Sequence, residues 1–427
     1  MKTWLLAGGV LLLAATSLIA QQQPARRDTT RADSARAKAI ADSLELVRQA
    51  EAAQGAQQPP QQQPMGAASG PTNPRLLPDF SAVGDLVGDL SPKGSTQDDN
   101  TRFGVREVEL AVQAAVDPYF RGDVFLGLND LEKVSIEQAF LTTTALPYGL
   151  ELRLGRELLP IGKQNETHRH DLQTIEYPWV LQRFLSPDGL KGTGIRISKL
   201  LAPFGFYQEL IVTVDDQFGE GSDTLQTLLA VNRRLGGMGF TARFRNYWDL
   251  TQNANLELSA SAATGDRAQP VTGELLPTGI NAIIARQSLV GADLTFRWRP
   301  LQQGLYRSFI LQVEVMGQFN EHNPTIPPEL EQFTYAGPTR DFAGAYVFAR
   351  WQIRQRAFIG ARGDWLQDPL LNGGNFLAGS LYYELFPSEF SKINLAYERT
   401  APHEQVAVNR FLLQASFSLG PHKPHPF

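Results

Sequence analysis

The sequence contains no cysteine, and after its first twenty residues it has no long hydrophobic run. Without cysteine we expect no disulfide framework, no thiolate metal site and no lipoprotein anchor, whereas an exported destination remains compatible. A membrane-spanning helix needs about 18 consecutive apolar residues, so a helical membrane protein is excluded. The net charge of −5 argues against a nucleic-acid-binding protein, which would need a concentrated basic face.

Residues 1–77 differ in composition from the rest of the chain. The segment 1–20 has one lysine, an apolar run and a small residue at its end, which predicts a signal peptide cleaved before Gln21. Residues 21–77 are first charged and alanine-rich, then rich in proline and glutamine, which predicts a short periplasmic helix on a flexible linker. A coiled coil and a disordered spacer are the alternatives for this segment. The folded domain is expected over 78–427.

From residue 78 onward, apolar and polar residues alternate with a period of two in segments of about 9–14 residues. In VREVELAVQAAV, for example, the apolar face opposes Glu107, Glu109 and Gln113. Charged residues occupy the polar face, while Trp, Tyr and Phe gather at the segment ends. A soluble sandwich would bury its apolar faces against each other, whereas a lipid-embedded barrel turns them outward and keeps a wet, charged interior. The pattern therefore predicts an all-β fold, a transmembrane antiparallel β-barrel.

Short and long connections alternate along the chain, as expected for a barrel with tight periplasmic turns and longer extracellular loops. This alternation predicts sixteen strands. They are expected at 78–88, 103–116, 119–129, 133–144, 148–156, 192–200, 206–214, 238–249, 255–264, 286–299, 306–319, 342–354, 357–365, 376–386, 390–399 and 408–419. The long connections are expected at 89–102, 157–191, 215–237, 265–285, 320–341, 366–375 and 400–407. The second outside connection, at 130–132, is short and is the exception to the alternation. The first segment has weak strand propensity and is included partly because an even number of strands places both termini in the periplasm.

One segment carries a resemblance to a known family. Residues 152–172, LRLGRELLPIGKQNETHRHDL, have a strand ending in Gly-Arg and then a Pro-x-Gly-Lys sequence that opens a long loop. With PDFSAVGD at 78–85 and the ending SLGPHKPHPF, this segment resembles the porin family that includes the phosphate-selective porins. The resemblance implies a sixteen-stranded, usually trimeric outer-membrane channel. The resemblance does not identify the substrate of this chain. Phosphate-selective members line the pore with many lysines, whereas this chain has nine lysines, which are scattered along the sequence.

The predicted connection 157–191 is the third outside loop and the longest in the chain. In porins the third loop generally folds into the lumen and narrows it, and a loop of this length is commonly functional. Its charged and polar residues are therefore candidates for a constriction. These candidates are Lys163, His168, Arg169, His170, Asp171, Glu176 and Arg183. A solvated surface loop is the alternative.

Inward positions of the predicted strands carry arginines, which would concentrate anions in a narrow aqueous passage. The wall candidates are Arg153, Arg196, Arg243, Arg245, Arg297, Arg299, Arg350, Arg354 and Arg362. Acidic residues occupy other inward positions, including Glu257, Asp293 and Glu314. Two hypotheses therefore stay open: an anion-preferring channel, and a general pore lined by cross-strand ion pairs.

The sequence predicts no enzyme, cofactor or metal site. The pairs His168-x-His170 and His422-x-x-His425 could each contribute to a metal site, but neither has a third ligand nearby in sequence. A membrane-embedded hydrolase is a less favoured alternative, since no Gly-x-Ser-x-Gly motif accompanies the histidines. The favoured hypothesis is an outer-membrane porin for passive diffusion of small hydrophilic, including phosphate-like anionic, solutes. The alternative from another class is a structural or receptor-type barrel whose lumen is plugged by loops.

The expected partners follow from this hypothesis. They are the lipid bilayer of the outer membrane, the outer-membrane assembly machinery, the transported solutes and further copies of the chain in a homotrimer. The last predicted strand, 408–419, turns Phe411, Phe417 and Leu419 toward lipid and must pair with the first strand to close the barrel. Either Phe417 or the terminal Phe427 resembles the signal that the assembly machinery recognises.

Deletion of residues 420–427 distinguishes the two phenylalanines, because the prolines of this segment prevent it from extending the strand. The deletion abolishes assembly if Phe427 is recognised and is tolerated if Phe417 is recognised. Heat-modifiable electrophoretic mobility of outer-membrane fractions measures the assembled amount.

Overall fold

The computed structural model describes residues 78–97, 101–129, 133–201, 203–216, 218, 237–272, 282–326 and 334–420. The predicted signal peptide and linker at 1–77, and the terminal segment 421–427 with Phe427 and the second histidine pair, lie outside the described residues. Within the described part of the chain, no helix is both long and apolar enough to cross a bilayer.

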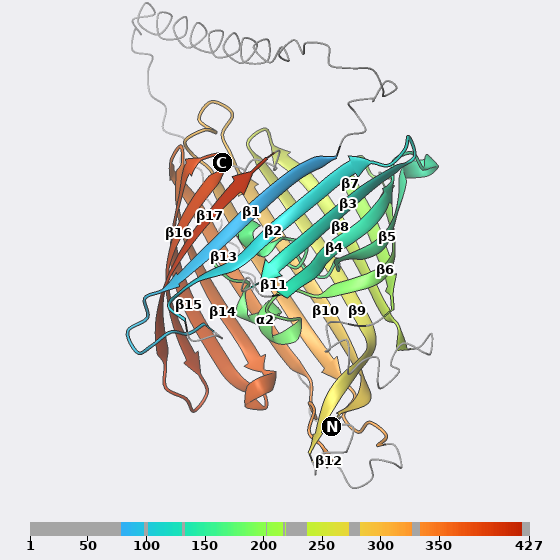
Figure 1. Cartoon of the computed structure of the whole chain (residues 1–427), viewed down its shortest axis with the longest axis vertical. Helices are drawn as coiled ribbons and strands as arrows, with labels where there is room; N and C mark the ends of the chain where they lie inside the picture. The colour runs from blue at the N-terminus through green and yellow to red at the C-terminus, as the bar shows by residue number, and fades with distance from the viewer. Residues whose placement is uncertain are drawn as a thin grey trace, which may run out of the picture. The chain divides into compact units, whose positions relative to one another are not determined.

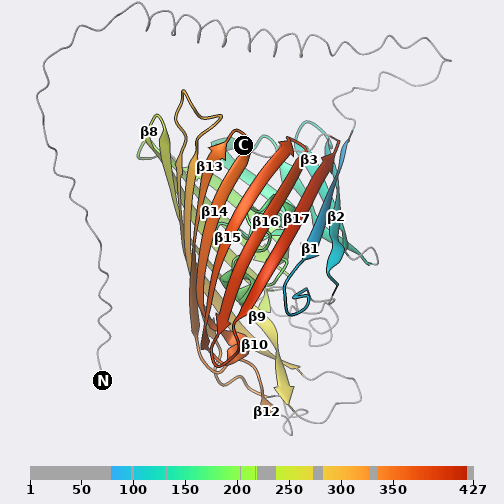
Figure 2. The same cartoon turned by 90° about the vertical axis from the view of Figure 1, so that its left-hand side faces the viewer.

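Sixteen strands form a closed antiparallel barrel in the described part of the chain (Figures 1 and 2). They are β1 (Asp79–Asp89), β2 (Phe103–Ala115), β3 (Phe120–Asn129), β4 (Lys133–Thr143), β5 (Leu150–Leu158), β6 (Lys191–Leu201), β7 (Tyr207–Asp215), β8 (Gly239–Thr251), β9 (Ala254–Thr272), β10 (Ala282–Trp298), β11 (Phe309–Asn320), β13 (Phe342–Arg354), β14 (Ala357–Asp368), β15 (Gly374–Ser388), β16 (Ser391–Pro402) and β17 (Val408–Leu419). Each strand pairs with its neighbours along the chain, and β1 pairs with both β2 and β17. The predicted fold class, number of strands and strand order are therefore confirmed.

The largest difference from the predicted boundaries lies in β9 and β10. Both continue past the predicted 255–264 and 286–299, because they keep pairing with each other out to Ala282 and Pro270. A two-residue strand, β12 (Thr334–Tyr335), adds to the end of β9. The expected long connection 265–285 is thereby shortened to 273–281. The extended hairpin projects beyond the barrel at the end where the long loops lie (Figure 2).

The two faces of the wall have opposite polarity. In β6, Ile195 and Ile197 are about half exposed on the outer face, whereas the alternate residues Arg196 and Ser198 are buried on the inner face. The same alternation holds in β17, where Phe411 and Phe417 face outward and Gln414 faces inward. An apolar exterior around a polar interior is the arrangement that a barrel needs when hydrocarbon surrounds it. The predicted facing of the strands is confirmed.

Aromatic side chains form a group where the strands meet the short turns. Trp298 stacks on Trp351 with ring centroids 5.8 Å apart, and Phe309 contacts the same indole. Farther around the wall, Phe206 and Trp248 are in contact at 5.0 Å. Such rings are amphipathic and favour the headgroup region, so this group fits one aromatic girdle of a membrane barrel.

The closing seam joins β1 to β17 in register, with Gly84 opposite Phe417. Gly84 belongs to the outer face, yet it is buried because the Phe417 ring lies over it. A Cβ atom at position 84 would come within 2.5 Å of the Phe417 ring. The glycine in the weakest predicted strand therefore makes room for an aromatic ring that covers the seam.

Gly84→Val should weaken the seam, because the new side chain must displace the Phe417 ring. We expect the free energy of unfolding, measured by urea titration of the barrel in lipid vesicles, to fall by about 1–3 kcal/mol. Gly379→Val is the matched control, since Gly379 also faces outward and a Cβ there meets no atom within 4 Å. Equal losses in the two variants would contradict the proposed packing of Phe417 on Gly84.

Candidate functional site

The connection between β5 and β6, residues 159–190, lies inside the barrel and is called the lumen loop below. It contains a short 3-10 helix, Arg169–Asp171, and the helix α2 (Trp179–Phe184). Figure 1 shows α2 within the ring of strands, and α2 contacts β13 and β14 on the side of the barrel away from β5 and β6. The predicted constriction candidates are therefore brought into the lumen.

The beginning of the lumen loop explains the Pro-x-Gly-Lys sequence. Gly162 has a φ of 64°, in the left-handed region that favours glycine, and a Cβ there would overlap the carboxylate of Glu314 on β11. The main-chain nitrogen of Gly162 donates to Ser261 of β9 at 3.0 Å. This turn lets the next residue, Lys163, donate to both oxygens of Glu257 at 2.7 and 2.8 Å.

Ion pairs then join the loop to the wall strands β6 and β8. The carboxylate of Glu166 lies 3.0 Å from Arg196 and 2.8 Å from Arg243. Burial raises the pKa of Glu166, but the two guanidinium groups outweigh it and lower the pKa below its ordinary value. Glu166, which carries no signal of its own in the sequence, is thus a central residue of the site.

Farther along the loop, side chains of the wall donate hydrogen bonds to carbonyl groups of the loop backbone. Lys392 of β16 donates to the carbonyl oxygens of His170 and Leu172, the second at 2.9 Å. Arg106 of β2 donates to the carbonyl of Ile175 at 2.9 Å. A buried backbone carbonyl without a partner is costly, so these cations allow an irregular segment to lie inside the barrel.

Glu176 is held by a bidentate ion pair. Both of its carboxylate oxygens accept from Arg410 of β17 at 2.9 Å, and Arg410 also bonds Glu398 at 2.9 Å. Burial alone would raise the pKa of Glu176, but Arg410 and the neighbouring Arg169 and Arg106 lower it to about 2. The bidentate pair fixes the loop against the strand that closes the barrel.

An apolar face of the lumen loop packs on the inner wall. Leu172, Ile175, Val180, Leu181 and Phe184 are buried in one cluster. Inward-facing wall residues complete it, among them Phe342, Tyr346, Phe348, Leu366, Phe376 and Tyr382. Sequence reasoning missed this contact because it treated the inner face as uniformly polar. The signal was present in FAGAYVFAR, where both faces of one strand are largely apolar.

The predicted wall arginines are mostly paired with carboxylates. Arg153 pairs with Glu151 and Glu157, Arg243 also with Asp293, Arg245 with Glu209 and Glu257, Arg297 with Glu257, Arg350 with Glu384, and Arg362 with Asp364 and Glu398. Arg299 differs from the prediction: it lies just beyond β10, is exposed, and donates to the carbonyl of Gly304 within the turn. Arg354 is also exposed, at the last position of β13. The wall contacts are ion pairs within and between strands rather than a row of unpaired cations.

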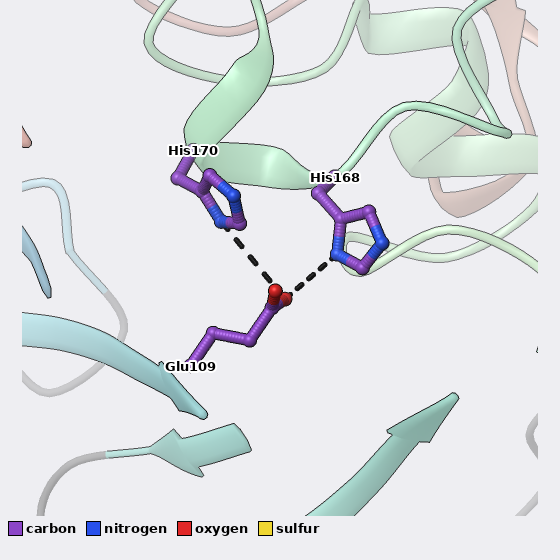
Figure 3. A group of neighbouring side chains, drawn as sticks. All are labelled: Glu109, His168 and His170. Atoms are coloured by element: carbon purple, nitrogen blue, oxygen red, sulfur yellow. Dashed lines mark hydrogen bonds and ion pairs between the residues drawn. The ribbon is translucent and has the colours of Figure 1, made fainter. Parts of the chain in front are cut away.

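The predicted loop histidines meet a third residue that the sequence did not indicate. His168 Nδ1 lies 2.7 Å from Glu109 Oε2, and His170 Nδ1 lies 4.0 Å from the same atom (Figure 3). Burial lowers the pKa of both rings, but the hydrogen bond and charge of Glu109 raise that of His168 above its ordinary value, whereas His170 stays below it. Asp171 is exposed beside His170. The sequence placed Glu109 on the inward face of its strand but gave no sign that it lies beside these histidines.

The remaining loop candidates make separate contacts. Arg169 pairs with Asp188 within the loop at 2.8 Å, and Arg183 at the end of α2 lies 3.2 Å from Asp368 of β14. Among the hollows of the described part of the chain, two sizeable ones adjoin the loop. One, of about 250 Å³, lies against β1, β2 and β4 and is lined by Arg106, Glu107, Glu137, Arg169, Asp188 and Lys191 among others. The other, of about 710 Å³, lies near the short turns and is lined by Lys163, Arg245, Asp249, Glu257 and Arg297 among others.

Comparison with known proteins by sequence gives a distant relative. No protein-family model matches the chain. An uncharacterized protein of Aquifex aeolicus (strain VF5) is 26% identical over 349 residues, which cover 76% of this chain and 70% of that protein.

Solved structures of outer-membrane proteins share the fold. A loop L8 deletion mutant of OmpT, an outer membrane protein of Vibrio cholerae, has a TM-score of 0.51 and 11% identity over 81% of this chain and 100% of its own. The trimer form of in-vitro folded OmpT has a TM-score of 0.50 and 10% identity over 80% and 99% of the two chains. The anion-selective porin from Comamonas acidovorans also has a TM-score of 0.50 and 10% identity, again over 80% and 99%. The chain therefore has the fold of porin-type outer-membrane barrels.

Acid should release the lumen loop through Glu176. Because its pKa is depressed from 4.5 to about 2, its contribution to holding the loop is complete above pH 4.5 and is lost as the pH falls toward 2. This contribution is about 3 kcal/mol at neutral pH. Since the chain has no cysteine, Pro187→Cys in the exposed part of the loop gives a unique site for a spin label.

We expect the label's mobility to rise between pH 4.5 and 2 in the parent protein. In Glu176→Gln the label should be mobile already at neutral pH, because the bidentate pair with Arg410 is gone. Glu404→Gln, at an exposed position in another loop, is the control and should leave the pH profile unchanged. An identical acid transition in Glu176→Gln and in the parent would show that Glu176 does not hold the loop.

Proposed function

We propose that the protein is an outer-membrane porin, a passive diffusion channel for small hydrophilic solutes whose lumen is narrowed by the lumen loop. The observation that carries this proposal is the loop itself, which crosses a polar, charged interior and is fastened to β2, β9, β11, β14, β16 and β17. A polar interior favours water and hydrated solutes, and a fixed loop sets the size of the passage. The proposal includes no catalysis and no cofactor.

The proposed selectivity follows from the charges around the smaller hollow. Arg106, Arg169 and Lys191 supply three positive charges, and Glu107, Glu137 and Asp188 supply three carboxylates. Because the wall arginines are also paired, we propose that selection depends chiefly on solute size and on a transverse field. The anion preference expected from the arginines stays a prediction, which the anion-selective name of one structural neighbour supports by analogy alone.

Membership of a trimer is also proposed. One structural neighbour is described in a trimer form, and the chain shares its barrel fold. In this arrangement three copies stand side by side in the outer membrane with the short turns toward the periplasm, and each copy keeps its own lumen loop.

A second candidate function is a receptor-type or structural barrel whose lumen is plugged. It is favoured by the apolar cluster between the lumen loop and β13–β15, which is packed like a protein interior and would resist movement of the loop. The two candidates make opposite predictions for ion flow.

Reconstitution of the purified protein in a planar bilayer decides between them. A porin gives a steady open current in symmetric salt, whereas a plugged barrel gives none over a range of salt concentrations. Across a salt gradient, the zero-current potential of a mixed-charge pore should stay small, while an anion filter should give a potential with the anion's sign.

Replacement of Arg243 and Arg245 by glutamine tests the charge of the passage. The change removes two cations and leaves Glu166, Asp293 and Glu209 without these partners, so the zero-current potential should move toward the cation's sign. Arg399→Gln is the control, because Arg399 is exposed on the outer face of β16 and should not affect the potential. An unchanged potential in the double variant would place the conducting path elsewhere.

A further inference from the structure

The most distinctive chemical group outside the ion-pair network is formed by Glu109 of β2 with His168 and His170 of the lumen loop. Their ligand atoms all lie within 4.8 Å of one another. Figure 3 shows both imidazole rings turned toward the Glu109 carboxylate, one from each side. The sequence offered two histidines at alternate positions without a third ligand, and the fold supplies that ligand from a strand about 60 residues away in the chain.

We propose that Glu109, His168 and His170 bind a divalent transition-metal ion, with Zn²⁺ as the best match. Two imidazole nitrogens and one carboxylate oxygen are a ligand set that Zn²⁺ commonly takes. Bond lengths of about 2.0–2.2 Å in tetrahedral geometry place neighbouring ligand atoms about 3.3 Å apart. The two distances to Glu109 Oε2, 2.7 and 4.0 Å, lie on either side of this value, and all three ligand atoms lie within 4.8 Å of one another, so rotation of the side chains must bring them to the required spacing.

The surroundings position the ligands. His170 and Glu109 are 2% and 4% exposed, so neither side chain is free to swing into open solvent. The Nε2 atom of His170 lies 3.7 Å from the Asp171 carboxylate, and Lys392 holds the main-chain carbonyl of His170. Carboxylates behind metal-bound imidazoles fix the ring orientation and increase the basicity of the ligand nitrogen.

His168 requires one rearrangement on metal binding. Its Nδ1 now shares a proton with Glu109, and its Nε2 lies 2.6 Å from the amide nitrogen of Gln138 on β4. With Nδ1 on the metal, the proton resides on Nε2, and the Gln138 amide must turn so that its oxygen accepts from it. Metal binding thus replaces the proton between His168 and Glu109 and leaves Gln138 as the outer partner.

The smaller hollow provides access and a fourth ligand. His168 and Gln138 line it, together with Glu107, which is two residues from Glu109 on the same face of β2. Its volume of about 250 Å³ holds several water molecules, so one water can complete a tetrahedral site with three protein ligands. A metal ion here joins the lumen loop directly to β2 and therefore tightens the loop's attachment.

Zinc binding can be measured without reference to ion conduction. The full-length chain is purified without a histidine tag, stripped of metal with a chelator, and titrated with Zn²⁺ by calorimetry in detergent. The parent for this experiment carries His422→Gln and His425→Gln, because the second histidine pair offers a competing site. We expect one equivalent of Zn²⁺ per chain, and no binding of Mg²⁺ at the same concentration.

Variants of the three ligands identify the site. Glu109→Gln, His168→Gln and His170→Asn should each weaken Zn²⁺ binding by about 10-fold or more. His322→Asn is the matched control, since His322 pairs with Asp341 at an exposed position and should leave binding unchanged. Heat-modifiable mobility confirms that each variant is folded, and any one of the three that folds is sufficient for the test.

The visible spectrum of Co²⁺ provides a second measurement. A tetrahedral site with nitrogen and oxygen ligands gives an intense spectrum that Glu109→Gln should alter and His322→Asn should not. Absence of saturable Zn²⁺ binding in the parent, or equal affinities in Glu109→Gln and the parent, would overturn the proposal. Either result would leave the proposed channel function intact, because conduction is measured separately.

Discussion

Pairing of backbone groups is the constraint on which the rest of this structure depends. Hydrocarbon offers no partner to an N–H or C=O group, so every wall strand must be hydrogen-bonded on both edges. The β1–β17 seam meets that requirement, and the Phe417 ring over Gly84 covers it from the lipid side. Once the wall is closed, alternation places apolar residues outside and polar residues inside. The charged interior is therefore a consequence of closure in lipid.

The same constraint applies to the lumen loop, which carries irregular backbone into a confined interior. Its carbonyl groups are satisfied by Lys392, Arg106 and Arg362 from three different strands. Cations that would otherwise face the open interior are thus used to hold the loop. This explains why an interior rich in arginine forms a network of ion pairs, with Glu166 and Glu176 as its anions on the loop. In the proposed channel, charge selectivity and loop position are coupled, because one group of residues determines both.

The lumen loop has three different faces. One face is apolar and packs on β13–β15, another carries the ion pairs, and the third presents His168 and His170 to Glu109 beside the smaller hollow. The first two hold the loop in place under all conditions near neutral pH. The strength of attachment at the third face depends on what is bound there. A metal ion at this face would therefore alter the loop's attachment to β2 and not its packing on the opposite wall.

The sequence by itself determined the barrel, the sixteen strands and the direction in which their side chains face, because these follow from a period of two and from connection lengths that are local properties of the chain. It also marked the connection 157–191 as the longest in the chain, whereas the expectation that this segment enters the lumen came from the resemblance to porins. Only the tertiary structure decided the partners: the apolar surface under α2, the carboxylates that pair with the arginines, the place of Arg299 in a turn, and Glu109 beside the two histidines. Each of these contacts joins residues far apart in sequence across a closed interior, and no local pattern encodes which residues meet there.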